Sequence, residues 1–230
     1  MLKSKSIRIV ALVPMKGHSE RIPSKNLKHF NGVPLYHRVL TTLLSSKYID
    51  AVVINTDGAL IKEDILLHFD EKVIIHDRPK EIQGDFVSMN EIIAYDIAHE
   101  EATFYLQTHS TNPLLTVASI DKAIEKMIEL VQSKLYDSIF SVTKIQTRLY
   151  DAHMKPVNHN PAELIRTQDL PPLFEENSNF YIFSKNSFIN NDNKRIGKSP
   201  YMFELDKTEA IDIDEPQDFV IAEAIDKVLR

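Results

Sequence analysis

A cation-rich loop follows the first apolar segment of the chain and is the clearest candidate for chemistry. Residues 13–26 read Val-Pro-Met-Lys-Gly-His-Ser-Glu-Arg-Ile-Pro-Ser-Lys-Asn and come directly after the apolar run Ile7–Val13. A flexible turn exposes backbone N–H groups, and Lys16, Arg21 and Lys25 add positive charge, so the pattern indicates a phosphate cradle. The alternative is a basic surface loop, because such side chains are usually solvated. The residue order matches neither a P-loop nor a dinucleotide-binding glycine motif.

Two carboxylates near the end of the chain form the second candidate. The segment reads Ile211-Asp212-Ile213-Asp214-Glu215-Pro216, which we expect at the end of a strand. Residues i and i+2 of a strand point to the same side, so Asp212 and Asp214 can share one divalent cation. Carboxylate oxygens of this kind suit Mg²⁺. For Asp214 alone, the alternative is that it caps the helix that follows.

Two further polar segments follow predicted strands. Gln107–Pro113 offers amide and hydroxyl groups that can recognise a base or a sugar, and its alternative interpretation is a polar turn. Arg78, with Ser88 further along the chain, either reaches a phosphate or pairs on the surface with Asp77 or Glu81.

The composition excludes several classes of function. The chain has no cysteine, which removes disulfides, thiolate nucleophiles and cysteine-based metal sites. Its nine histidines include neither a His-Glu-x-x-His motif nor a close pair, so no zinc site is expected. A net charge of −6 argues against nucleic acid as partner. Without a signal peptide or an apolar run of about 18 residues, we expect a cytoplasmic protein with no membrane contact.

The hydrophobic periodicity alternates between strand and helix. Strands are expected over Arg8–Val13, Ala51–Asn55, Lys72–His76, Phe104–Leu106 and Ser138–Val142, and helices over Leu35–Leu44, Leu60–Phe69, Met89–Ala98, Ile120–Val131 and about Pro216–Leu229. This alternation predicts a single α/β domain over residues 1–230, with a three-layer, doubly wound, mostly parallel sheet. Ligands of such sheets bind at the carboxyl ends of the strands, where the loop Pro14–Asn26 is expected.

The alternation stops between Thr143 and Asn179. This stretch contains four prolines, Pro156, Pro161, Pro171 and Pro172. Ordinary connections run about 4 to 6 residues, so the segment is predicted to be a functional lid or an interaction arm that leaves the sheet. Strands are expected to resume at Asn179–Ser184 and at Ala210–Asp214.

Taken together, these segments resemble the acylneuraminate cytidylyltransferase family, whose members make CMP-activated sugar acids. The resemblance extends over nearly the whole chain. It is carried by Arg21–Asn26, Gly32–Leu35, Asn55–Asp57, Arg78-Pro79 with Asp85, Gln107 with Asn112–Leu114, Ser141-Val142, Arg166–Pro172, Glu175–Asn177 with Phe180–Phe183, and Asp212–Asp214 with Asp218-Phe219.

The resemblance implies a Rossmann-like nucleotidyltransferase that transfers CMP from CTP to the anomeric hydroxyl of a sialic-acid-like 2-keto-3-deoxy sugar acid and releases pyrophosphate. It also implies a homodimer in which residues 143–179 reach the partner's cleft. It assigns nucleotide binding to Pro14, Met15, Lys16, Gly17, Lys25, Asn26, Arg78 and Ser88. It assigns sugar-acid binding to Gln107, Arg166, Gln168 and Asn177, Mg²⁺ binding to Asp212 and Asp214, and catalysis to Lys16, Arg21, Lys25 and Asp212, with Asp212 acting on the hydroxyl through the metal.

The chain departs from the family pattern in its first loop. The usual order Pro-Ala-Arg-Gly-Gly-Ser-Lys-Arg is replaced by Pro-Met-Lys-Gly-His-Ser-Glu-Arg, which introduces Lys16, His18 and Glu20. Lysine supplies charge without the bidentate fork of arginine, and Glu20 repels a triphosphate if it points inward. Either Glu20 faces solvent or the site binds its ligand differently. The segment after Gln107 is longer than in the family, which alters the sugar pocket.

Three alternatives stay open at this point. The chain is another sugar nucleotidyltransferase, a metal-dependent glycosyltransferase that uses Asp212 and Asp214, or a non-catalytic nucleotide-binding dimer.

Overall fold

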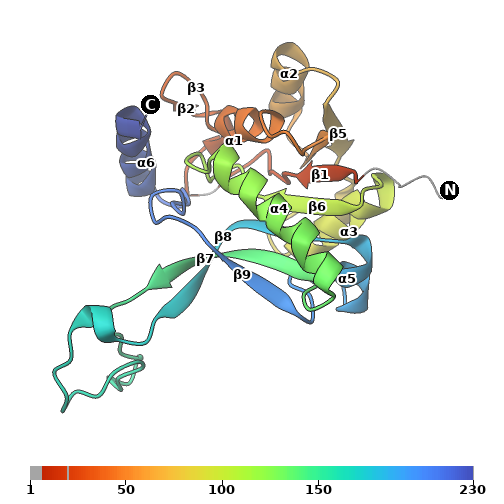
Figure 1. Cartoon of the computed structure of the whole chain (residues 1–230). Helices are drawn as coiled ribbons and strands as arrows, with labels where there is room; N and C mark the ends of the chain where they lie inside the picture. Colours follow the sequence, from red (N-terminus) through yellow and green to blue (C-terminus); the bar gives the residue numbers. More distant parts are fainter. Residues whose placement is uncertain (1–6, 20, 230) are drawn as a thin grey trace.

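A seven-stranded sheet forms the centre of the molecule (Figure 1). The computed structural model describes residues 7–19 and 21–229. The strand order is β5-β4-β1-β6-β8-β7-β9. The strands are β1 (Ile9–Leu12), β4 (Ala51–Thr56), β5 (Val73–Asp77), β6 (Phe104–Thr108), β7 (Ser138–Ile145), β8 (Leu173–Phe183) and β9 (Pro200–Glu204).

The sheet is mostly parallel, as the sequence predicts. Strands β5, β4, β1 and β6 run parallel to one another, and β7 runs parallel to β9. Strand β8 is the exception, because it pairs antiparallel with both β6 and β7. Residues of β1 alternate between the two faces, with Ile9 and Ala11 in one core cluster and Val10 and Leu12 in the other. Both faces are therefore buried, as expected for a parallel sheet.

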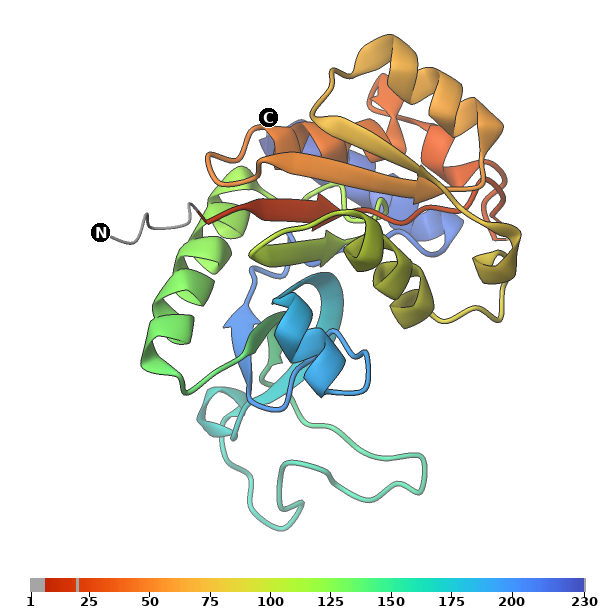
Figure 2. The same cartoon turned by 90° about the vertical axis from the view of Figure 1, so that its right-hand side faces the viewer.

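Helices cover both faces and complete the predicted three layers (Figure 2). One face is covered by α1 (Leu35–Leu44), α2 (Ala59–His68) and α4 (Val117–Ser133), and the other by α3 (Met89–His99) and α5 (Lys185–Asn190). The apolar stripe of α4 is buried at Ile120, Ile124 and Met127 but is 41% exposed at Val131. The predicted stripe is thus correct except at its last position.

The C-terminal helix α6 (Pro216–Leu229) packs on a small hairpin of β2 (His29–Phe30) and β3 (Val33–Pro34). Phe30 and Phe219 meet edge to face with ring centroids 5.6 Å apart. Asn31, whose φ of 46° is allowed for a turn asparagine, donates from Nδ2 to the Asp226 carboxylate. These contacts hold the end of the chain beside the loop that follows β1.

The predicted excursion is shorter than the sequence indicates. We expected residues 143–179 to leave the sheet, but β7 continues to Ile145 and β8 begins at Leu173, and these two residues pair. The irregular part is therefore 146–172, which includes only the short 3-10 helix η3 (Thr167–Asp169). Both views show this arm extending away from the body of the molecule (Figures 1 and 2). Proline and polar residues obscured the strand ends, because a strand exposed on both faces lacks an apolar pattern.

The prediction of a strand over Ala210–Asp214 is wrong. Residues 211–214 form an irregular segment, and the last strand is β9, which together with α5 was not anticipated. The segment is fixed instead by a backbone hydrogen bond of 2.9 Å from Ile213 N to Thr111 O. Among the described residues, no helix has the length and hydropathy required to cross a membrane.

Candidate functional site

A cleft of about 380 Å³ lies at the carboxyl ends of β1 and β6. Five of the predicted nucleotide-binding residues line it, Pro14, Met15, Lys16, Lys25 and Asn26, together with Arg21. The opposite wall comes from His109, Ser110 and Thr111, which follow β6. The structure thus brings the first loop and the Gln107 segment to one site, as parallel strand ends require.

The first loop leaves β1 along the neighbouring strand. Val13 N and Met15 N donate to the carbonyls of Val53 and Asn55, so the strand pairing continues to Met15. Gly17 N then donates to the Asp57 carboxylate at 2.7 Å. A Cβ on Gly17 would lie 2.6 Å from Gly58 Cα, and a Cβ on Gly58 would lie 2.8 Å from Gly17 Cα. Glycine at both positions allows the two loops to touch.

Arg78 supports this loop from below. Its side chain is buried, with 4% exposure, and donates from Nη2 to Met15 O at 3.1 Å and to Asn55 O at 2.7 Å. Its Nε donates to Asn55 Oδ1, and Asn55 in turn donates to the fully buried Asp96. The surface pairing with Asp77 or Glu81 considered from the sequence is excluded by this burial. In the structure Arg78 orients the loop backbone, and its contact with a nucleotide stays a prediction.

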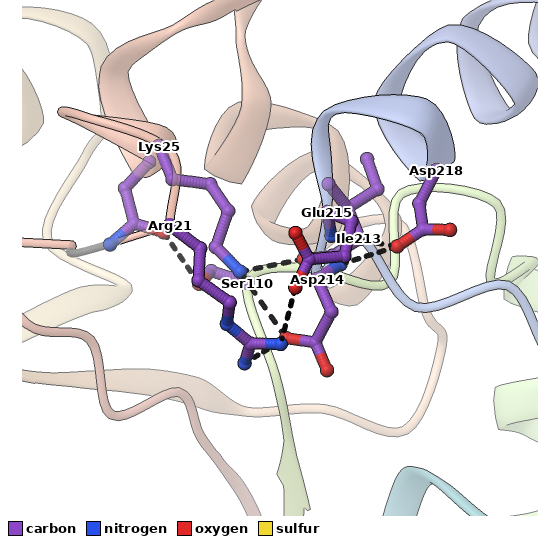
Figure 3. A network of polar contacts seen from close by, with 8 residues as sticks. Arg21, Lys25, Ser110, Ile213, Asp214, Glu215 and Asp218 are labelled. Carbon is purple, nitrogen blue, oxygen red and sulfur yellow. Dashed lines mark hydrogen bonds and ion pairs between the residues drawn. The ribbon is translucent and has the colours of Figure 1, made fainter.

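Cations of the loop pair with the acidic segment near the C-terminus (Figure 3). Arg21 Nη2 lies 2.8 Å from Asp214 Oδ1, and Lys25 Nζ lies 3.7 Å from the same oxygen. Lys25 also donates to Ile213 O at 2.6 Å, and Arg21 reaches Glu215 at 3.2 Å. The two candidate motifs of the sequence therefore face each other across one site.

Asp214 does not cap the last helix. The carboxylate of Asp218 does so, because it accepts from Asp214 N at 3.1 Å and from Glu215 N at 2.7 Å (Figure 3). Asp218 lies in the first turn of α6, where a negative charge also interacts favourably with the helix dipole. The capping alternative for Asp214 is wrong, and its carboxylate faces Arg21 and Lys25.

Asp212 is largely buried beside this network. Its Oδ1 atom is inaccessible and has no hydrogen-bond partner among the described residues. Burial raises the pKa of its carboxyl group, and the nearby charge of Asp214 adds to the rise, whereas the hydrogen bond with Thr111 opposes it. A buried carboxylate oxygen without a donor, next to a second carboxylate, fits a hard cation such as Mg²⁺.

Lys16 and Asn26 complete the loop. Lys16 Nζ pairs with Asp85 at 2.7 Å on the cleft wall. Asn26 donates to Lys16 O and accepts from the Ser110 hydroxyl, so it joins both walls of the cleft. Glu20 lies outside the described residues, and the prediction about its direction stays a prediction.

Ser88 does not line the cleft among the described residues but begins α3. Its side chain accepts from Glu91 N at 3.3 Å and donates to Glu91 Oε1, which is a capping arrangement. This local role accounts for the serine, and its assignment to the nucleotide stays a prediction.

Gln107 is fully buried below the cleft rather than on its surface. Its Nε2 donates to Thr108 O at 2.8 Å, and its Oε1 accepts from Arg195 Nη1 at 2.6 Å. Arg195 lies 4.0 Å from the centroid of the Tyr181 ring. Burial, followed by the positive charge of Arg195, lowers the pKa of His109 to about 4. His109 is therefore neutral at neutral pH, and an arginine stands directly behind the wall that it forms.

Arg195 was missed from the sequence because nothing near it forms a motif. It lies in the irregular segment between α5 and β9. Only folding places it against Gln107, 88 positions earlier in the chain.

The remaining predicted substrate residues lie away from the cleft of their own chain. Arg166 pairs with Asp169 at 2.7 Å on the arm, and Gln168 accepts through its backbone carbonyl from Gln146. Asn177 joins β7 and β8 through Ser141 and Thr143. Their roles toward a sugar acid stay predictions.

Comparison with known proteins gives a family match over almost the whole chain. A family model described as cytidylyltransferase matches residues 10–227. N-acylneuraminate cytidylyltransferase A of Danio rerio is 31% identical over 99% of this chain and 52% of its own length. Pseudaminic acid cytidylyltransferase of Campylobacter jejuni is 26% identical over 95% of this chain and 96% of its own length. The chain spans about half the length of the fish relatives that it matches.

Solved structures show the same fold at low sequence identity. A CMP:2-keto-3-deoxy-manno-octonic acid synthetase complexed with CTP superposes with a TM-score of 0.69, at 12% identity, over 97% of this chain and all of that one. A 4-diphosphocytidyl-2C-methyl-D-erythritol synthase of Anaerococcus prevotii superposes with a TM-score of 0.64, at 13% identity, over 98% of this chain and all of that one. The predicted Rossmann-like α/β fold is confirmed.

The burial of Asp212 predicts that this residue destabilises the metal-free protein. The pKa of the Asp212 carboxyl is raised in the folded state, so folding favours the protonated form. The free energy of unfolding therefore falls as the pH rises above the usual pKa of an aspartate. Asp212→Asn should add about 0.5–2 kcal/mol to the free energy of unfolding at neutral pH, measured with urea and a chelator. This increase in the free energy of unfolding should vanish at about pH 4, where the Asp212 carboxyl of the folded protein is protonated.

Asp206→Asn is the matched control. Hydrogen bonds from the Thr208 side chain and backbone lower the pKa of the exposed Asp206, so its removal should bring no gain. A loss of stability in Asp212→Asn at neutral pH would show that the Asp212 carboxylate is well accommodated without a metal.

Proposed function

Because the chain belongs to the cytidylyltransferase family, we propose that it transfers CMP from CTP to the anomeric hydroxyl of a sialic-acid-like 2-keto-3-deoxy sugar acid. The observation that carries the proposal is the direct pairing of Arg21 and Lys25, which line the cleft, with Asp214 of the acidic segment. The match to relatives that are named for N-acylneuraminate and pseudaminic acid supports the substrate class.

The reaction forms a bond between the sugar's anomeric oxygen and the α-phosphorus of CTP, and breaks the bond from that phosphorus to the oxygen of the leaving pyrophosphate. The hydroxyl loses its proton in this step, and Asp212 would help to remove it. Its barrier is lowered by neutralising charge and by aligning the reactants. Lys16, Arg21 and Lys25 supply that charge from the wall of the cleft. The backbone on either side of Lys16 is held by Arg78 and by the contact between Gly17 and Gly58.

Asp212 and Asp214 would hold Mg²⁺, which when bound neutralises charge at the α-phosphate. The free Oδ1 of Asp212 supports this assignment, since that buried oxygen has no donor among the described residues.

We place the carboxylate of the sugar acid at Arg195. A 2-keto acid carries a carboxylate, and arginine is the side chain best suited to bind one in a planar, bidentate manner. Arg195 borders a hollow of about 210 Å³ and is held by Gln107 and Tyr181. Among the described residues, this hollow shares no lining residue with the cleft that His109 lines. Gln107 then acts on the acid through Arg195, which explains why it is buried.

Pyrophosphate release tests the activity. With CTP, Mg²⁺ and a panel of 2-keto-3-deoxy sugar acids that includes sialic and pseudaminic acids, at least one acid should give turnover above the rate without acid. Asp212→Asn should abolish this turnover in a folded protein, while Asp206→Asn should retain it. If CTP binds by calorimetry but no acid gives pyrophosphate, the chain is a nucleotide-binding protein without this activity.

Arg195→Gln tests the carboxylate site. Hydrogen bonds to charged groups contribute about 1.5–3 kcal/mol, so the KM for the acid should rise about tenfold to a hundredfold while the KM for CTP is unchanged. The control is Lys185→Gln, which removes a cation that pairs with Glu101 and does not line this hollow. Equal effects of the two variants on the acid would assign the result to general electrostatics.

We also propose that the protein is a homodimer joined through the arm 146–172. Several of its apolar side chains are exposed, among them Met154 at 84%, Val157 at 54% and Leu164 at 93%. Such side chains on an extended arm favour burial against a second copy. Arg166 and Gln168 lie on the same arm and would then serve the partner's cleft.

Leu164→Asp should weaken the dimer about tenfold or more in sedimentation experiments, because it places a charge in an apolar contact. Leu66→Asp, on α2 and 75% exposed, provides the control and should leave the association unchanged. A wild-type protein that sediments as a monomer at high concentration contradicts the proposal.

A further inference from the structure

We propose that His37, Asp64 and His68 form a transition-metal site that joins helices α1 and α2, apart from the proposed Mg²⁺ site. This is the one group of three potential metal ligands found among residues 7–19 and 21–229. Its ligand class is two imidazoles and one carboxylate, which suits Zn²⁺ and ions of similar preference such as Co²⁺.

The ligand atoms already lie close together. All three are within 4.8 Å of one another. His37 Nε2 is 2.5 Å from Asp64 Oδ2, and His68 Nδ1 is 3.1 Å from Asp64 Oδ1. Around a tetrahedral zinc ion with bonds of about 2.0–2.1 Å, neighbouring ligand atoms are roughly 3.4 Å apart. The His68 Nδ1 atom also lies 2.9 Å from the backbone carbonyl of Asp64, so binding an ion requires this ring to turn away from that carbonyl. It also requires the ligand atoms of His37 and Asp64 to separate by about 1 Å.

Neighbouring groups orient two of the ligands. The His37 ring packs edge-on against Phe69 and Tyr36, with centroid distances of 4.8 Å and 4.6 Å. The fully buried Tyr36 donates its hydroxyl hydrogen to Asp64 Oδ2. Metal-binding carboxylates and imidazoles are commonly held by such outer contacts, which fix their orientation.

The site is open to solvent on one side. Access comes from the side of His68, whose side chain is 53% exposed, while those of His37 and Asp64 are 12% and 20% exposed. Three protein ligands with one open side leave a fourth position for water.

The histidine spacing in the sequence hides this site. Asp64 and His68 are four residues apart on one face of α2, but the third ligand comes from α1, 27 positions before Asp64. No short sequence motif spans such a separation along the chain. A bound ion would connect two helices of the same layer, in addition to the hydrogen bonds and ring contacts that already join them.

Calorimetric titration with Zn²⁺, in the presence of excess Mg²⁺ to occupy hard oxygen sites, tests the proposal. We expect one site per chain, and Co²⁺ in its place should give the visible absorption of four-coordinate cobalt. His68→Gln and His37→Gln should each weaken Zn²⁺ binding at least about tenfold, and Tyr36→Phe by about tenfold through the outer contact.

His99→Gln is the matched control. His99 is an exposed histidine near the end of α3, and its Nδ1 contacts the backbone carbonyl four residues earlier, as that of His68 does. Its partner residue is Tyr95 instead of an aspartate, so Zn²⁺ binding should be unchanged. Absence of Zn²⁺ binding, or equal loss in the His68 and His99 variants, overturns the proposal. Unchanged affinity in His68→Gln with a loss only in Asp212→Asn would assign the ion to the nucleotide cleft and also overturn it.

Discussion

The ion pairs from Arg21 and Lys25 to Asp214 join two segments that are almost two hundred positions apart in the chain, and they hold the acidic segment beside the loop that lines the cleft. Arg21 and Asp214 are about half exposed, so their attraction is screened by water and adds little to stability. Lys25 is different, because its side chain is only 13% exposed and donates to the carbonyl of Ile213. These contacts therefore matter for geometry more than for stability, because they set the carboxylates at a fixed place relative to the loop.

The same contacts define what a triphosphate would have to displace. Arg21 and Lys25 share Asp214, and Lys16 pairs with Asp85, so each loop cation already has an anionic partner. Under the proposed function, phosphate oxygens replace these carboxylates, and the released Asp214 becomes available to a cation beside Asp212. Nucleotide and metal would then bind with positive coupling, since each frees a partner of the other. Lys16 stands where the family usually has an arginine. It is compatible with this exchange, because the exchange requires positive charge rather than the bidentate geometry of a guanidinium group.

Periodicity predicted the layers of the fold because most strands and helices here bury a continuous apolar pattern. The limits of α1, which are those expected, illustrate this, and so does the buried stripe of α4. The pattern failed where elements are exposed or short, as at the outer half of β8 and at α5 and β9. In the candidate site, loop chemistry predicted Lys16 and Lys25, which line the cleft, and the aspartate pair, which lies beside it. It was wrong to place Asp212 and Asp214 on a strand. Local sequence patterns could not predict Arg195 or the group of His37, Asp64 and His68, because each depends on residues that only tertiary packing brings together.

The contact between Gly17 and Gly58 has a consequence for how this protein can change over evolution. A methyl group at either position would meet the backbone of the other loop at less than 3 Å, so neither glycine can be replaced while both loops stay in place. The two positions are under one shared constraint although 40 residues separate them. A lineage that substitutes one of them has to displace a loop, and that displacement moves Lys16 as well. A single substitution at either glycine therefore changes the candidate ligand site, whereas the neighbouring exposed positions can vary independently.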